Sequence, residues 1–144
     1  GYPPLLDTLA DPPPVLALLG DPAALGPRAV AVVGARNASA AGRRIAGDLA
    51  EALAAHGLVV VSGMARGIDA AAHQGAMRKG RTGAVVACGL DQPYPPENAP
   101  LQARIAAEGG AVLAEAPLGT APHARHFPRR NRIVAGLSLG VVLV

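Results

Sequence analysis

Arginine side chains concentrate near one end of this 144-residue sequence. The sequence has 13 basic residues, all arginines except Lys79, and residues 116–144 contain four arginines without a single aspartate or glutamate. A solvated charged surface usually mixes the two signs, whereas the forked guanidinium group matches a phosphate through two parallel hydrogen bonds. The cluster therefore favours an anionic partner that carries phosphate. Its members are Arg125, Arg129, Arg130 and Arg132.

Two further arginines follow short apolar runs. Arg36 comes after the run at 29–33, and Arg66 lies between Gly63 and Gly67 after the run at 58–61. Glycine allows a phosphate to approach backbone N–H groups closely, and a helix N-terminus favours negative charge. Because ligands of open parallel sheets bind beyond the carboxyl ends of the strands, we expect both arginines to face one crevice.

The segment that starts at Phe127 combines an aromatic ring, a proline and three arginines. Pro128 is typical of the first turn of a helix, so a helix is predicted from about Arg129 to Leu137. Cations at a helix N-terminus oppose the macrodipole, so a bound polyanion explains them better than helix stability does. The side chains expected at this N-terminus are Arg129, Arg130 and Asn131.

Aromatic residues are scarce, at 2% of the sequence. Stacking can therefore hold few bases or rings, and most of the affinity for a polyanion should come from phosphate contacts. The aromatic residues are Tyr2, Tyr94 and Phe127.

Catalytic and cofactor patterns are weak. Asp69 and His73 share a helix face, but we interpret Asp69 as a first-turn acid and His73 as a packing or hydrogen-bonding residue that faces it. Cys88 is expected to be a buried cysteine at a strand end. The glycine that follows Gly34 is Gly42, so the dinucleotide fingerprint is absent. No catalytic residue, metal site or cofactor is expected.

The elements that must position these residues follow from short apolar runs that alternate with helical segments. This alternation predicts parallel βαβ units, hence an α/β fold with a Rossmann-like, doubly wound, mainly parallel sheet and helices on both faces. Strands are predicted at 29–33, 58–61, 83–87, 111–114 and 140–144, and helices at 39–56, 68–79, 97–108 and 129–137.

The predicted organisation is a proline-rich lead-in at residues 1–28, with a possible edge strand at 15–19, followed by one core at 29–144. The sequence stops inside an apolar strand, so we expect the native protein to continue. A hydrophobic fraction of 51% excludes a disordered chain, and no apolar run is long enough to cross a bilayer. With one cysteine and no secretion pattern, we expect a cytoplasmic protein without a membrane partner.

Five segments, in this order, resemble the motifs of the DNA-processing protein A family (DprA, also called Smf). The resemblance implies a Rossmann-like core that binds single-stranded DNA, forms homodimers, protects the strand and helps load the RecA recombinase during DNA uptake and natural transformation, without catalysis. The segments are Val33 to Arg36, Val61 to His73, Cys88 to Asp91, Tyr94 to Asn98, and Phe127 to Ser138.

The same resemblance implies the DNA-binding residues. Ala35 and Leu139 depart from it, because serine is common at the first position and a polar or basic residue at the second. The flanking domains of many family members are absent from this sequence. The implied DNA contacts are Arg36, Arg129, Arg130, Asn131 and Arg132, with Gly63, Arg66 and Gly67 as further positions.

Two alternatives stay open. One is a nucleotide phosphoribohydrolase on a related Rossmann-like fold, although its characteristic loop carries a glutamate that is missing after Gly119 and Thr120. The other is an interaction scaffold on which the basic helix is fortuitous.

Overall fold

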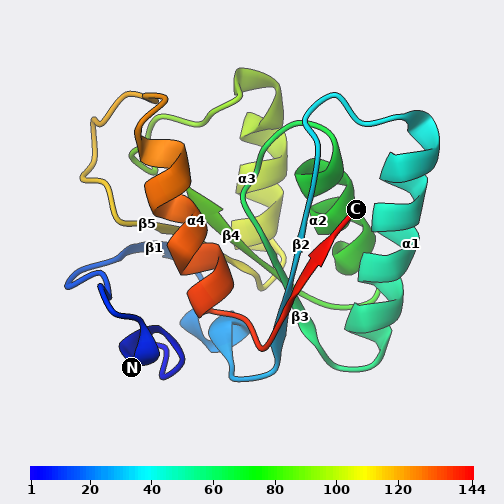
Figure 1. The fold of residues 1–144 in the computed structure, drawn as a ribbon, viewed down its shortest axis with the longest axis horizontal. Helices are drawn as coiled ribbons and strands as arrows, with labels where there is room; N and C mark the ends of the chain where they lie inside the picture. Colours follow the sequence, from blue (N-terminus) through cyan, green and yellow to red (C-terminus); the bar gives the residue numbers. More distant parts are fainter.

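The structure is a computed structural model that describes residues 1–144. One six-stranded sheet runs through the molecule in the order β1-β5-β4-β3-β2-β6 (Figure 1). The strands are β1 (Ala17–Gly20), β2 (Ala29–Val33), β3 (Val59–Ser62), β4 (Thr82–Val86), β5 (Ala111–Ala114) and β6 (Val141–Leu143). The helices are α1 (Ala40–Ala55), α2 (Ile68–Met77), α3 (Ala99–Ala107) and α4 (His126–Gly136), with the short 3-10 helices η1 (Leu6–Thr8), η2 (Pro22–Leu25) and η3 (Pro96–Asn98).

The predicted doubly wound architecture is confirmed. All neighbouring strands from β5 to β6 are parallel, and only the edge strand β1 runs antiparallel to its neighbour β5. The chain moves outward from β2 through β3 and β4 to β5, then returns across the sheet to place β6 on the other side of β2. This reversal opens a crevice at the carboxyl ends of β2 and β6, where ligands of such sheets usually bind.

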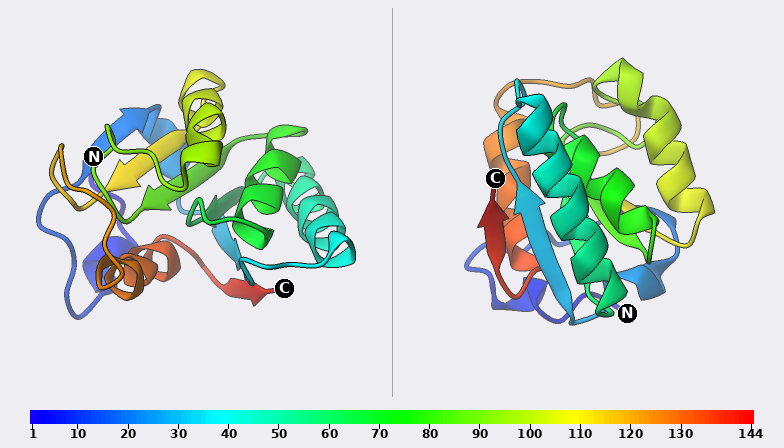
Figure 2. Two further views of the ribbon diagram at one scale, coloured as in Figure 1. Left: turned by 90° about the horizontal axis from the view of Figure 1, so that it is seen from above. Right: turned by 90° about the vertical axis from the view of Figure 1, so that its right-hand side faces the viewer.

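Helices cover both faces of the sheet, as the buried strands require. Helices α1, α2 and α3 lie on one face, and α4 lies on the other together with the N-terminal segment (Figure 2). In the interior under α4, Leu6 of η1 and Leu25 of η2 pack with Ile133 and Leu137. The lead-in is therefore part of the core, and it follows the sheet edge as expected.

The possible edge strand at 15–19 forms two residues later, as β1. Its residues pair with β5 from Ala17 opposite Ala114 to Gly20 opposite Ala111. An antiparallel edge needs no crossover helix, which explains how a proline-rich segment before β2 can still join the sheet.

The predicted start of the last helix is wrong by three residues. Helix α4 begins at His126, so Pro128 is its third residue and Arg129 and Arg130 lie in the second turn. Proline is tolerated anywhere in the first turn because those N–H groups have no intrahelical acceptor. The arginines therefore lie deeper along the helix than a proline at its first position would place them.

Candidate functional site

Four loops meet at the carboxyl edge of the parallel strands, beside the first turns of α4 (Figure 1). Arg36, from the loop after β2, and Arg130, from α4, line the same cleft although 94 positions separate them. Of the arginines at 125–132, only Arg130 lines this cleft together with Arg36. The loops are at 34–39, 63–67, 87–95 and 115–125.

The ring of Phe127 forms the centre of this cleft. The Arg36 guanidinium carbon lies 4.9 Å from the ring centroid, and that of Arg130 lies 5.6 Å away, both within the range of a cation–π interaction. The Tyr94 ring is 6.0 Å from the Phe127 ring, with a tilt of 54°. We call this small cavity, of about 30 Å³, the Phe127 cleft; its lining includes Arg36, Gly63, Arg66, Tyr94, Phe127 and Arg130.

Arg36 is the exposed cation of the Phe127 cleft. Its guanidinium makes no hydrogen bond or ion pair within the chain and lies over the Phe127 ring. A cation held over an aromatic face without an ionic partner can accept a phosphate without first breaking a salt bridge.

Arg130 is instead built into the interior, with 6% of its surface exposed. Its Nη1 atom donates to the carbonyl oxygens of Gly63 at 2.6 Å and Val85 at 2.8 Å, and its Nε donates to Asn131 at 3.0 Å. Burial lowers the pKa of Arg130, and the charge of Asp69 opposes that shift. Arg130 therefore ties α4 to the ends of β3 and β4, a role that the sequence did not indicate.

The loop between β3 and α2, where backbone N–H groups were expected to bind phosphate, instead binds the Asp69 carboxylate of the chain itself. Asp69, which is 5% exposed, accepts through Oδ2 from the backbone N–H of Gly63 at 3.1 Å and of Ala65 at 3.4 Å. Burial raises the pKa of Asp69, while the bond from Ala65 and the charge of Arg130 lower it. These two backbone donors are consequently unavailable to a ligand.

Gly63 and Gly67 are explained by packing. A Cβ at Gly63 would lie 2.9 Å from both the Arg130 guanidinium carbon and an Asp69 carboxylate oxygen. Gly67 has a φ of +76°, and a Cβ there would collide with the carbonyl oxygens of Ala35 and Arg36. Gly67 thereby lets the loop that carries Arg36 lie against the start of α2.

Two of the other expected DNA contacts are engaged in ion pairs. Arg66 pairs with Glu97 at 2.5 Å. Arg132 forms a two-pronged pair with Glu115, at 2.7 and 2.9 Å, and reaches the backbone oxygen of Asp11. The hydrogen bond from Arg132 lowers the pKa of Glu115, so the carboxylate keeps its charge further into acid than a free glutamate does.

Arg129 and Asn131 lie on different sides of α4. Arg129 also faces Glu115, at the longer distances of 3.4 and 3.5 Å, and its side chain remains 63% exposed. Asn131 lines a second cavity of about 320 Å³, together with Gly34, Arg36 and Leu143 at the point where the strand order reverses. The side chains of the basic segment therefore point to two different sides of α4.

The interpretation of His73 and Cys88 as structural residues agrees with the geometry. His73 is fully buried and its Nδ1 lies 2.7 Å from the Thr82 hydroxyl, so its partner is Thr82 and not Asp69 as expected. Burial lowers the pKa of His73 to about 3, which leaves the ring neutral. Cys88 is buried at the end of β4, and burial raises the pKa of its thiol.

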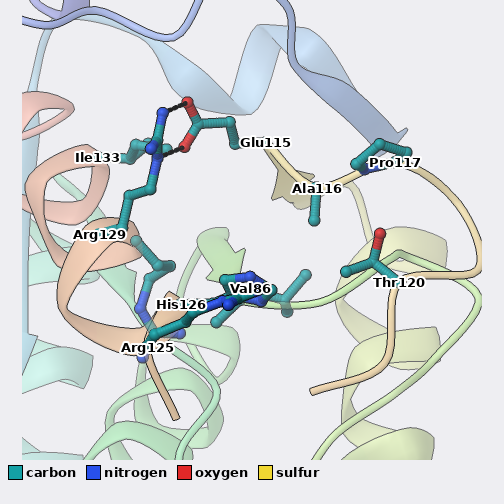
Figure 3. A pocket seen from close by; sticks show the side chains of 11 residues that line it. Val86, Glu115, Ala116, Pro117, Thr120, Arg125, His126, Arg129 and Ile133 are labelled. Carbon is teal, nitrogen blue, oxygen red and sulfur yellow. Dashed lines mark hydrogen bonds and ion pairs between the residues drawn. The ribbon is translucent and has the colours of Figure 1, made fainter. Parts of the chain in front are cut away.

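Sequence reasoning missed a larger cavity between the 115–125 loop and α4, which we call the β5–α4 cavity. It measures about 400 Å³, and Arg125, His126 and Arg129 face Thr120 and Ala116 across it (Figure 3). The spacing of Arg125 and Arg129, one helical turn apart, is the signal that could have indicated it.

Two general features complete the description of the chain. No group of three or more histidine, cysteine, aspartate or glutamate side chains is arranged to hold a metal ion. None of the four helices combines the length and the apolar character that a membrane crossing requires.

Comparison with known proteins identifies relatives over the whole chain. Residues 1–144 match the family described as DNA recombination-mediator protein A. The chain is 44% identical to Protein Smf of Synechocystis, over 99% of this chain and 37% of that protein. It is 41% identical to DNA processing protein DprA of Bacillus subtilis, over 99% of this chain and 48% of that protein. It thus spans half or less of these curated relatives.

Two solved structures have the same fold. DNA processing protein A of Streptococcus pneumoniae superposes with a TM-score of 0.92 at 42% identity, over 99% of this chain and 50% of that one. The protein of the same name from Helicobacter pylori, studied for its single-stranded DNA binding mode, gives 0.90 at 36% identity, over 99% and 66%. From its motifs, its fold and these matches, the chain belongs to the DNA recombination-mediator protein A family, known as DprA or Smf.

Proposed function

We propose that this chain binds single-stranded DNA at the Phe127 cleft, with Arg36 holding a phosphate and the Phe127 ring stacking against a base. The observation that carries the proposal is the Arg36 guanidinium, which has no ionic partner and lies 4.9 Å from the centre of the Phe127 ring. Phosphate charge and a base face are the two features that every nucleotide offers, whatever its sequence.

The position of the aromatic rings favours a single strand over a duplex. Tyr94 and Phe127 line a cleft of about 30 Å³, which is too small to take up a whole base, so a base that has left its stack lies against the rings from outside. In single strands the bases are already free to turn outward. The relative from Helicobacter pylori, which was studied for binding of this ligand, supports the same assignment.

The distribution of ion pairs predicts which arginines supply the affinity. Arg36 and Arg125 have no acidic partner, and Arg129 is held only at 3.4 Å or more by Glu115. Arg66 and Arg132 would have to give up carboxylate partners at 2.5 and 2.7 Å before they bound phosphate. We therefore assign the main phosphate contact to Arg36.

The test is a salt series of binding to a fluorescent single-stranded oligothymidylate by anisotropy. Arg36→Gln should weaken binding about fivefold and lower the slope of log affinity against log salt by about 0.7, the value for one phosphate on a single strand. Arg28→Gln is the matched control, since Arg28 is exposed and precedes β2 at the opposite edge of the sheet. If both variants bind equally, the assignment of the cleft is wrong.

The finer role that we propose follows from family membership. The chain protects incoming single strands and helps load the RecA recombinase on them during natural transformation, acts as a homodimer, and carries out no catalytic step. Nuclease protection, RecA strand exchange on coated DNA and sedimentation test strand protection, RecA loading and dimer formation in turn. Loss of RecA stimulation in Arg36→Gln, but not in Arg28→Gln, is the expected outcome.

A further inference from the structure

The β5–α4 cavity adjoins the Phe127 cleft but is larger, at about 400 Å³ against about 30 Å³. Ala87 and Arg130 line both cavities, so the two lie side by side. A volume of this size is within the range of small-molecule sites.

The walls of the β5–α4 cavity are chemically divided. Val86, Ala116, Pro117 and Ile133 provide an apolar side. Figure 3 shows Arg125, His126 and Arg129 on the α4 side, facing Ala116, Pro117 and Thr120 on the loop side. An apolar wall beside a few polar groups suits a flat heterocycle, and a cationic rim suits the phosphate attached to it.

Several polar groups of this cavity have no partner in the chain. The Nδ1 atom of His126 is buried without a hydrogen bond, and the Arg125 side chain makes neither a hydrogen bond nor an ion pair. Arg129 is held only loosely, because Arg132 occupies Glu115 at 2.7 and 2.9 Å while Arg129 stays at 3.4 and 3.5 Å. A buried polar atom that lacks a partner needs an explanation, and a bound polar ligand is one.

We propose that the β5–α4 cavity binds a second nucleotide unit. Its base lies against Ala116 and Pro117, where His126 and Thr120 reach the base edge. Its phosphate lies between Arg125 and Arg129. The inference rests on the proposed function, because in a bound strand this unit would neighbour the one in the Phe127 cleft. A free nucleotide has the same chemistry and would use the same groups.

The experiment uses backbone amide NMR of the chain with two probes, dTMP and an oligothymidylate. Shifts at residues 116–120 and 125–126 with either probe are expected: shifts with dTMP mean that a free nucleotide suffices, and shifts with the oligothymidylate alone mean that the unit must be part of a strand. No shift there with either probe overturns the inference.

Two variants supply an independent measurement. Ala116→Leu fills the cavity and Arg125→Gln removes one rim charge, so each should weaken oligothymidylate binding about fivefold, and Arg125→Gln should also lower the salt slope by about 0.7. Arg28→Gln should bind like the parent. If Arg125→Gln and a folded Ala116→Leu both bind like Arg28→Gln while Arg36→Gln is weakened, the inference fails and the proposed function stands. If the parent binds no single-stranded DNA, the proposed function fails, and the dTMP shifts alone decide about the cavity.

Discussion

Arg36 and Arg130 both lie within cation–π distance of the Phe127 ring, yet they occupy opposite environments. Arg36 projects from an exposed loop and has no ionic partner, whereas Arg130 is 6% exposed and donates to two strand-end carbonyl groups. The difference shows that arginines near a ligand site divide into charges offered to a ligand and charges that hold the site together. Only the first kind should contribute to salt-dependent affinity.

The same division separates the two sides of α4. On the Phe127 side, the exposed Arg36 guanidinium has no ionic partner. On the other side, Glu115 binds Arg132 closely and Arg129 loosely. One glutamate at the end of β5 thus offsets one of the four positive charges of this segment, and it engages two of the four arginines.

The largest expected effect separates Arg130 from Arg36. Arg130→Ala should lower the free energy of unfolding by about 2 to 4 kcal/mol, because it leaves the buried carbonyl groups of Gly63 and Val85 without their donor and removes the positive charge that favours the buried Asp69 carboxylate. Arg36→Ala should change it by less than about 0.5 kcal/mol, as is usual for an exposed residue. Urea denaturation followed by circular dichroism measures both. If the two variants are equally stable, Arg130 does not hold the site together and the distinction between Arg130 and Arg36 is wrong.

A second prediction concerns His73, which shares the polar interior with Arg130. Its pKa of about 3 in the folded chain lies below the ordinary value of 6.5, so between these values the unfolded chain binds the extra proton. Stability should therefore fall as the pH falls through this window, by about 2 kcal/mol between pH 6.5 and pH 5 from this group alone.

The variant His73→Asn isolates this contribution. Its stability at each pH will be lower in absolute terms, but the part of the acid-induced loss that belongs to His73 should vanish. The exposed His56 provides the control, and His56→Gln should keep the full loss. If His73→Asn retains the parental slope between pH 6.5 and pH 5, the ring is not held neutral by the interior.

The sequence predicted the fold well because its signals are local. The apolar run at 29–33 forms β2 without any shift, and the others moved by about two residues at most. The partners of the arginines were not predictable in this way. Glu115 and Arg132 are 17 positions apart, and Arg66 and Glu97 are 31 apart, so only the folded chain shows that they meet.

The site was predicted in part for the same reason. The positions of Arg36 and Phe127 follow from strand ends, which a sequence pattern can locate. The burial of Arg130 depends on the carbonyl groups of Gly63 and Val85, which no pattern encodes. The start of α4 was misplaced because proline fits several positions of a first turn.

The smallest expected effect concerns Glu115. Glu115→Gln removes the negative charge that pairs with Arg132 and Arg129. Both arginines should then lack an ionic partner at this position, as Arg36 does. Stability should fall by about 1 kcal/mol, the range for an incompletely buried pair. Single-strand binding should tighten and depend more steeply on salt.

The pH dependence of this pair has a definite sign. Arg132 lowers the pKa of Glu115, so its contribution to stability is present at neutral pH and is lost in acid as the carboxylate protonates. Glu115→Gln should lack that loss. Anisotropy and urea denaturation measure the two effects, with Glu108→Gln on α3 as a control that leaves DNA affinity nearly unchanged. Weaker DNA binding by Glu115→Gln than by the parent would contradict the expectation.

The bare backbone at Gly63 limits how the Phe127 cleft could be redesigned. Any side chain there would strike the guanidinium of Arg130 and the carboxylate of Asp69. Even alanine at this position requires Arg130 or Asp69 to shift, so a saturation library selected for stability should be enriched in glycine. Substitutions meant to alter selectivity for a base should therefore be made at the exposed entrance of the cleft, at Tyr94 and in the loop that carries Arg36.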